Sequence, residues 1–196
     1  MRPPRSFYAR PSLEVAPELL GLNLVHNDGQ TLRIGRIVET EAYMGPEDLA
    51  AHSAGGRRTT RTEVMFGAPG HAYVYFIYGF WDCLNVVTSA VGIPHAVLLR
   101  ALEPVTGIEH GTWGPGLLCR ALGIDRTLNG ADLRGDVLWI ERPPGRRHAV
   151  RIGTGPRIGV EYAGDWARRP WRFFDRDSAF VSTLSPAARR RAGILK

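Results

Sequence analysis

Two glutamates in the stretch "RIVETEAY", residues 36–43, are the side chains best placed to carry chemistry. Side chains on a β-strand alternate between its two faces, so Glu39, Glu41 and Tyr43 share one face if no bulge intervenes. A carboxylate held on a rigid strand at the edge of a cleft can act as a general base or as a nucleophile. A half-exposed strand with a solvated acidic face has the same spacing. Strand geometry alone therefore leaves open whether the pair is functional and whether Glu39 or Glu41 would act.

A second unusual stretch is "YVYFIYGFWDCLN", residues 73–85, which gathers aromatic rings around Gly79. Each of its tyrosine hydroxyls needs a partner or water where it is buried. If the strand is regular, Tyr75 and Tyr78 face opposite sides and serve different surfaces. Gly79 would let the chain turn sharply directly after Tyr78. The stretch is expected to form two strands or one bent strand around Gly79, and its other rings are expected to be core: Phe76, Phe80 and Trp81.

Metal chemistry is a rival hypothesis, because His52 and Asp48 follow the two glutamates in "GPEDLAAH". A site of His52, Glu41 and Asp48 could assemble in space, although the chain has no HExxH motif and no glycine-rich phosphate loop. Cys83 and Cys119 form no CxxC pair, which argues against a thiolate zinc site and favours a reducing compartment. We therefore expect neither a metal nor a cofactor.

The composition favours a polyanionic partner. The chain of 196 residues is 44% hydrophobic, carries a formal charge of +6, and has a single lysine, Lys196, among its 25 basic residues. Arginine forks to phosphate and stacks on flat rings, which suits nucleic acid, although a coding bias with solvated arginines predicts the same composition. No apolar run is long enough to span a bilayer, and the N-terminus lacks a secretory signal. We expect no membrane partner and a cytoplasmic location, with nucleoid association in a bacterium.

The elements that must position these residues indicate one α+β domain over residues 1–196, with a mainly antiparallel sheet. Ser12 is expected to cap a short helix that stops at Gly21. Asp28-Gly29 predicts a hairpin turn whose second strand runs from about Thr31 to Tyr43. The polar, glycine-rich stretch that follows is irregular, and such long loops tend to be functional.

Further elements are expected in the second half of the chain. An apolar strand ends near Arg100, a short helix lies in "GPGLLCRALGI", and another strand lies in "ADLRGDVLWIERP". Glycine-punctuated strands are expected in "AVRIGTGPRIGVEYAG". Residues 185–196 are predicted to be a basic tail, helical or frayed, and its arginines 189–191 are not expected to read a groove.

Three longer motifs together resemble the alkyladenine DNA glycosylases, also called 3-methyladenine or methylpurine DNA glycosylases. They are ETEAY-x-GPED-x-AAH, Y-x-YFIYG-x(5)-N and LLRALEP, and the resemblance extends from about Ser6 to Ser182. It implies a single mixed α+β domain with a curved, mainly antiparallel sheet, short helices and a protruding β-hairpin. It also implies a monomer that flips damaged purines out of double-stranded DNA and releases them by hydrolysis, leaving an abasic site.

The resemblance implies roles residue by residue. Glu41 matches the base that activates water for attack at C1′, and Arg100 matches the arginine beside that water. Tyr78 matches the side chain that fills the gap left in the duplex, and Asn85 matches the residue that discriminates against the guanine amino group. The pocket for the flipped base is assigned to five residues: Tyr43, His52, Tyr75, Asn85 and Leu98. The implied lesions are 3-methyladenine, 7-methylguanine, hypoxanthine and ethenoadenine.

Arginines close to these motifs are candidate phosphate contacts, although each is equally well explained as solvated surface. They are Arg57, Arg58, Arg61, Arg168 and Arg169. The chain departs from the family at residues 104–118, which are shorter and place Leu117 where a lysine is expected. This departure is either a trimmed surface loop or a lost phosphate contact.

Two rivals to a glycosylase are the metal-dependent hydrolase above and a catalytically weak damaged-DNA-binding protein of the same fold. Joint retention of Glu41, Tyr78 and Arg100 argues against the second, since a sensor needs only the tyrosine and a basic surface. The absence of any lysine before Lys196 leaves no obvious amine for covalent chemistry, which favours water as the nucleophile.

Overall fold

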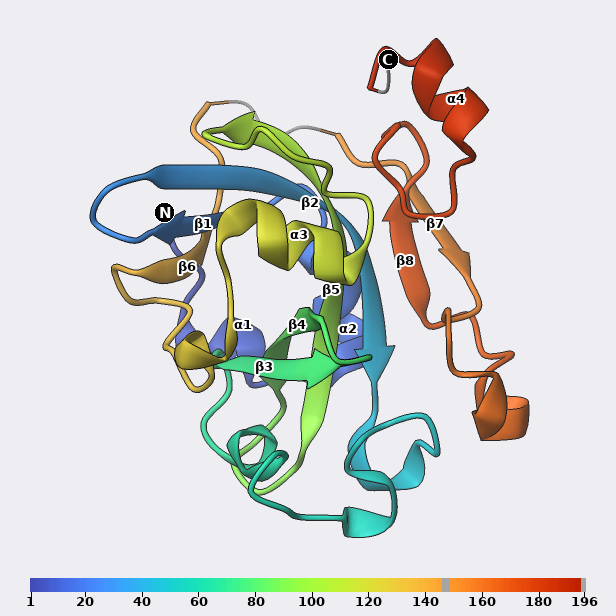
Figure 1. Ribbon diagram of the computed structural model, residues 1–196. Helices are drawn as coiled ribbons and strands as arrows, with labels where there is room; N and C mark the ends of the chain where they lie inside the picture. Colours follow the sequence, from blue (N-terminus) through green and yellow to red (C-terminus); the bar gives the residue numbers. More distant parts are fainter. Residues whose placement is uncertain (146–148, 195–196) are drawn as a thin grey trace.

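The computed structural model describes residues 1–145 and 149–194 and shows a curled antiparallel sheet with a few short helices around it (Figure 1). This confirms the expected α+β fold. The last two residues of the predicted basic tail lie outside the described residues. The strands of the eight-stranded sheet are β1 (Asn23–Asn27), β2 (Leu32–Tyr43), β3 (Ala72–Ile77), β4 (Trp81–Thr88), β5 (His95–Thr106), β6 (Leu138–Glu141), β7 (Ile152–Gly155) and β8 (Arg172–Asp175).

The helices of the described chain are short and lie mostly between strands. The α-helices are α1 (Arg5–Tyr8), α2 (Ser12–Leu19), α3 (Pro115–Leu122) and α4 (Pro186–Arg191). The 3-10 helices are η1 (Gly45–Glu47), η2 (Ala54–Gly56), η3 (Glu63–Phe66), η4 (Arg126–Leu128) and η5 (Glu161–Trp166). Among these described helices none is long and apolar enough to cross a membrane.

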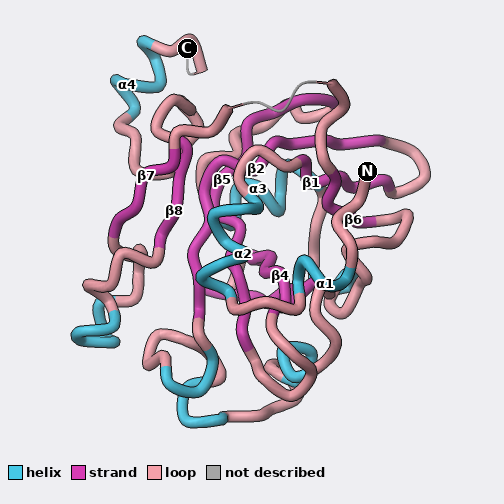
Figure 2. The backbone as a smooth tube through the Cα atoms, turned by 180° about the vertical axis from the view of Figure 1, so that it is seen from behind, coloured by secondary structure: helices cyan, strands magenta, loops and turns pink. Residues whose placement is uncertain are grey.

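Strand β2 is the centre of the sheet. The strand order is β3-β4-β5-β2-β1-β6, and β8 pairs with both β2 and β7. The first half of β2 pairs with β1, and residues Glu39–Glu41 of β2 pair with β8 along the same edge. The register against β5 shifts at Ile37/Glu39 and Glu39/Thr40, so β2 is bulged where its carboxylates lie. Figures 1 and 2 show the result: β7 and β8 stand at one side of the molecule and β1 and β6 at the other.

The hydrophobic core lies where the helices pack on the strands. Helix α2 packs on β2 and β5, and α3 packs on β4 and β5. Leu19 of α2 and Leu118 and Leu122 of α3 are fully buried in the core cluster, beside Leu99 and Leu102 of β5. Burial of such side chains is worth about 1.5–3 kcal/mol each. The carboxylate strand β2 is therefore packed against α2 and paired with β5, which is itself packed against α2 and α3.

Two local predictions about this framework are wrong. Ser12 does not cap α2, because the cap position is Pro11 and the Ser12 hydroxyl donates to the Tyr43 carbonyl over 3.0 Å. The hydroxyl thus bonds to a carbonyl at the end of β2 rather than to a free amide at the start of α2. Strand β5 does not end near Arg100 but continues to Thr106, because it stays paired with β2 along that length.

Most of the other local predictions are confirmed, and one is confirmed only in part. The hairpin turn at Asp28-Gly29 is confirmed, with β1 and β2 paired and Gly29 at a φ of +85°. The helices expected around α3 and in the basic tail are present, and β6 lies in the expected segment. Of the glycine-punctuated strands only β7 forms. The chain after it turns into η5, where Gly164 has a φ of 59°.

The aromatic stretch folds as the β3–β4 hairpin. Tyr78 and Gly79 occupy its turn with φ values of 56° and 76°, and the Phe80 amide donates to the Ile77 carbonyl over 3.4 Å. The tip protrudes from the packed structure, because Tyr78 is 74% and Phe80 67% exposed. Phe80 is therefore not part of the core, contrary to the prediction. A positive φ is unfavourable for a tyrosine and marks the position as constrained.

Candidate active site

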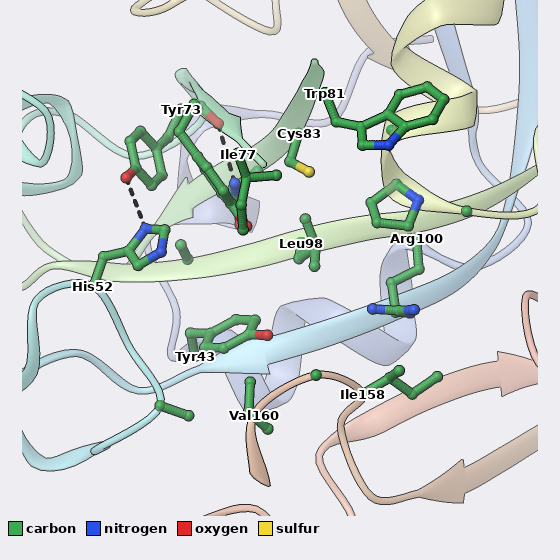
Figure 3. A pocket seen from close by; sticks show the side chains of 18 of the residues that line it. Tyr43, His52, Tyr73, Ile77, Trp81, Cys83, Leu98, Arg100, Ile158 and Val160 are labelled. Carbon is green, nitrogen blue, oxygen red and sulfur yellow. Dashed lines mark hydrogen bonds between the residues drawn. The ribbon is translucent and has the colours of Figure 1, made fainter. Parts of the chain in front are cut away.

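A cavity of about 490 Å³ lies between β2, the β3–β4 hairpin, β5, the start of α3 and the segment before η5. This volume is within the usual range for small-molecule sites. Figure 3 shows Tyr73 and Ile77 on one side of it and Tyr43, Ile158 and Val160 on the other. Its lining includes every predicted base-pocket residue and both Arg100 and Tyr78: Tyr43, His52, Tyr75, Tyr78, Asn85, Leu98 and Arg100.

One wall of the cavity is a cluster of three rings. The His52 Nδ1 lies 2.9 Å from the Tyr73 hydroxyl (Figure 3). The His52 ring meets the Tyr75 ring edge-on, with 4.6 Å between the ring centres. Tyr73 and Tyr75 are 5.4 Å apart and come from the same face of β3. Tyr73 was not among the predicted site residues, although its two-residue spacing from Tyr75 indicates a shared face. The Asn85 side-chain amide donates to the Tyr73 carbonyl over 3.2 Å, which orients Asn85 within the site.

His52 is held in its neutral form. Burial, followed by the charges of Arg61 and Arg57, lowers the pKa of His52 to about 4. An Arg61 guanidinium nitrogen lies 3.4 Å from Nε2, and a guanidinium can only donate. Nε2 is therefore the acceptor, so this network assigns the ring proton to Nδ1, which donates to Tyr73. The ring offers a flat, uncharged edge to the cavity at neutral pH.

Tyr75 and Tyr78 border the same cavity, which contradicts the expectation that they serve different surfaces. Strand alternation holds only within β3, which ends at Ile77. Tyr78 lies in the turn, and its positive φ turns the chain away from the strand direction. The exposed Tyr78 thus stands at the mouth while Tyr75 lines the interior.

Glu41 is fully buried directly behind the cavity wall. Its Oε2 accepts from the Tyr43 hydroxyl at 2.9 Å, and its Oε1 accepts from the Ile158 amide at 2.8 Å. An Arg100 guanidinium nitrogen lies 3.3 Å from Oε1. Burial raises the pKa of Glu41, and Arg100 and the two hydrogen bonds only partly oppose it. All three groups that hold this carboxylate line the cavity.

Glu39 is equally buried but has different partners. Arg172 donates to it over 2.9 Å, and Ser182 donates through its amide at 2.7 Å and its hydroxyl at 3.0 Å. Neither Arg172 nor Ser182 lines the cavity. Arg100 is shared, with its Nε 3.6 Å from Glu39. Burial alone lowers the pKa of Arg100, but Glu41 and Glu39 outweigh it and raise that pKa, so the arginine stays charged.

The triad of the metal hypothesis does not assemble. Asp48 forms a buried pair with Arg157, and both of its oxygens are used there. Within residues 1–145 and 149–194, no group of three or more His, Cys, Asp or Glu side chains is arranged to hold a metal ion.

The five candidate arginines lie in different surroundings. The central carbon of the Arg61 guanidinium lies 4.9 Å from the centre of the Tyr75 ring, so Arg61 packs against the ring wall formed by His52, Tyr73 and Tyr75. Arg169 stacks over Trp166 at 3.7 Å, beside η5. Arg58 pairs with Glu63 and Arg168 with Asp165 at the surface. Arg57 is exposed at the end of η2. Their proposed contacts with phosphate stay predictions.

Segment 104–118 is not wholly a surface loop, since its end forms part of the cavity. Gly114, Pro115, Gly116 and Leu117 all line it at the start of α3. Gly116 lies against the Trp81 ring so closely that an added Cβ would come within 2.6 Å of it. Trp81, which was predicted to be core, also lines the cavity and is only half-buried. Other lining residues that the sequence did not single out are Ile77, Ile158, Val160 and Tyr162.

Comparison with known proteins agrees with this geometry. The family model described as "Methylpurine-DNA glycosylase (MPG)" matches residues 6–179. A protein of Anaeromyxobacter dehalogenans (strain 2CP-C) named "Putative 3-methyladenine DNA glycosylase" is 56% identical over 187 residues, covering 95% of this chain and 89% of that protein. A protein of Bacillus cereus (strain AH820) with the same name is 51% identical over 203 residues, covering 93% of this chain and 99% of that protein.

Proposed function

Because the chain belongs to the methylpurine-DNA glycosylase family, and is thus a hydrolase of N-glycosyl bonds in DNA, we propose that it releases alkylated and deaminated purines by water attack at C1′. The lesions proposed are 3-methyladenine, 7-methylguanine, hypoxanthine and ethenoadenine. The observation that carries the mechanism is the position of Glu41, which is buried behind the cavity wall and is held by three groups that line it, Tyr43, Ile158 and Arg100.

The substrate must leave the duplex before the cavity can receive it. A glycosidic bond is inaccessible inside stacked DNA, so the damaged nucleotide has to be flipped out. Tyr78 is proposed to fill the resulting gap, because it is 74% exposed at the tip of a hairpin and borders the cavity mouth. An inserted side chain of this kind offsets part of the cost of unstacking.

The ring wall is proposed to hold the flipped base. Tyr75 of this wall and Tyr43 from β2 both line the cavity, and the face of an aromatic ring attracts a cationic alkylated purine. The neutral His52 adds no positive charge that would repel such a base. Asn85 and Leu98 lie on neighbouring strands at the same wall and are proposed to exclude normal purines by shape.

Glu41 is proposed to accept a proton from the attacking water. Hydrolysis of the bond passes through an oxocarbenium-like sugar, which a nearby carboxylate also stabilises by its charge. A carboxylate whose pKa is raised towards the working pH is a more effective general base than one at its ordinary value. Arg100, ion-paired with Glu41, keeps that carboxylate oriented and is proposed to lie beside the water.

The test is base release from duplexes that each carry one of the four lesions, with wild type and Glu41→Gln. Glu63→Gln is the matched control, because Glu63 is an exposed glutamate paired with Arg58. We expect release by wild type and by the control and its loss in Glu41→Gln. Full activity of Glu41→Gln would overturn the mechanism.

The same assay separates the rivals. Binding of lesion DNA by wild type without any base release would support the damaged-DNA-binding protein instead. Activity abolished by a chelator would support the metal-dependent hydrolase, and we expect activity to survive it. We also propose that the protein acts as a monomer, which light scattering of the purified protein alone and with DNA would check.

A further inference from the structure

Arg157 and Asp48 form an ion pair whose side chains are both 0% exposed. The bonds run in parallel, from Nη1 to Oδ2 at 2.5 Å and from Nη2 to Oδ1 at 2.8 Å. The guanidinium also donates to the carbonyls of Ala42 at 3.0 Å and Trp166 at 3.1 Å. One side chain therefore ties together the end of β2, the loop after η1 and the end of η5.

Two aromatic rings hold the same guanidinium. Its central carbon lies 4.7 Å from the centre of the Tyr43 ring and 5.0 Å from that of Trp171. Tyr43 is the residue whose hydroxyl donates to Glu41. The Arg157 side chain thus fixes one arm of the Glu41 environment through the Tyr43 ring and through the carbonyl of Ala42.

The other arm is the residue that follows Arg157 in the chain. The Ile158 amide donates to Glu41 over 2.8 Å. Because Ile158 directly follows Arg157, the position of this amide is tied to that of the arginine. On the preceding side, the Pro156 carbonyl accepts from Arg172 over 2.9 Å. A shift of the Arg157 side chain would therefore carry the Ile158 amide away from the carboxylate.

A buried ion pair is a poor source of stability, because desolvation of both charges cancels most of their attraction. The Arg157 Nε is also buried without a hydrogen-bond partner among the described residues, which adds to the cost. An apolar pair of similar volume would fill the same space without the desolvation cost of two charges. The pair is therefore better explained by what it positions than by what it stabilises.

We propose that Arg157, locked by Asp48, is a positioning residue that aligns the Ile158 amide and the Tyr43 hydroxyl on Glu41. The proposal rests on the proposed role of Glu41 as the base. It assigns a task in the reaction to Asp48, the second acidic residue of "GPED", which does not itself line the cavity.

The test is the pH dependence of single-turnover base release by Arg157→Gln. Loss of the Ile158 hydrogen bond removes an interaction that lowers the pKa of Glu41, so the acid limb should move to higher pH. The other charged or titratable groups facing Glu41 are Arg100, Glu39 and Tyr43. The variant leaves Arg100 and Glu39 in place, and a weakened Tyr43 hydrogen bond would shift the pKa of Glu41 in the same direction. We expect the rate at neutral pH to fall about 10- to 100-fold, as for a small misplacement of a reacting group.

Arg5→Gln is the matched control. Arg5 also forks to an aspartate, Asp132, and donates to the Pro69 carbonyl, but its partners lie outside the cavity lining. It should lower thermal stability without moving the acid limb. Affinity for a duplex carrying an uncleavable abasic-site analogue should stay within about twofold of wild type in both variants, because neither residue lines the cavity.

Asp48→Asn guards against a variant that does not fold, because it keeps the shape of the pair and the carbonyl bonds of Arg157. Its acid limb should move in the same direction by a smaller amount, and Arg157→Lys should restore part of the rate. Carbon NMR titration of the Glu41 carboxyl in these variants measures the same change in its pKa and does not depend on catalytic activity. A Glu41 titration and an acid limb that both superimpose on wild type in folded variants would overturn the positioning role. An unchanged Glu41→Gln rate would instead overturn the proposed function while leaving the titration result standing.

Discussion

Glu39 and Glu41 lie two residues apart on β2, are both fully buried and both approach Arg100, yet their surroundings differ. Glu39 faces Arg172 of β8 and the chain at Ser182, which saturate both of its oxygens. Glu41 faces groups that form the wall of a cavity. The comparison teaches that burial of a carboxylate does not by itself indicate catalysis. The two carboxylates differ in whether the groups that bind them line the cavity.

The largest expected effect is on the side of Glu41. Glu41→Gln should lower the single-turnover rate of base release at neutral pH by about 10² to 10⁴, the usual contribution of a general base. Its unfolding midpoint in urea should change much less than that of Glu39→Gln, because the amide can still accept from Tyr43 or Ile158. A variant that loses stability and rate together would erase the difference between the two carboxylates.

The next effect is on the side of Glu39. Glu39→Gln leaves the buried Arg172 without its charged partner, and breaking a buried pair costs about 3–5 kcal/mol. We expect that loss in the free energy of unfolding, measured in urea, with base release by the folded fraction kept within a few-fold of wild type. If stability were unchanged and release abolished, Glu39 would be the base and the assignment would be reversed.

The ring wall extends the comparison to His52, a half-buried histidine that lines the cavity. Arg61→Gln removes a charge that lowers the pKa of His52, so this pKa should rise from about 4 towards its ordinary value, with burial still holding it below. Imidazole NMR titration measures the shift, and Arg58→Gln, which removes a neighbouring surface arginine, should leave it unchanged.

The pH dependence of the folding stability follows from the proton that His52 takes up. Because His52 takes up its proton at lower pH in the folded than in the unfolded protein, its contribution is fully present above pH ~6.5 and is lost as the pH falls towards about 4. In Arg61→Gln that loss should be smaller. A wild-type stability curve with no decline across this window beyond that of His52→Gln would contradict the buried neutral ring.

The smallest effect is expected at the start of α3. Leu117→Lys should restore one phosphate contact, which would steepen the dependence of log affinity on log salt by about one unit. Val105→Lys adds the same charge at an exposed position that does not line the cavity. Equal slopes for both variants and wild type would show that Leu117 replaces no contact with DNA.

Local patterns in the sequence carried much of the fold. The Asp28-Gly29 turn, the long carboxylate strand, the α3 helix and the paired strands around Gly79 follow from turn residues and from periods of two and 3.6 residues. The family motifs predicted residues that the structure gathers around one cavity from β2, β3, β4 and β5 and from the loop carrying His52. Their roles in catalysis remain predictions.

Tertiary structure alone decided which carboxylate is held by groups that line the cavity, because the distinguishing partners lie far away in the chain. Ile158 is 117 residues from Glu41, and Ser182 is 143 residues from Glu39. Strand alternation encodes which face a side chain takes but not what is packed against that face. The same limit explains Ser12, whose hydroxyl is captured by Tyr43 from another element. It also explains Tyr78, whose positive φ ends the alternation that the sequence predicts.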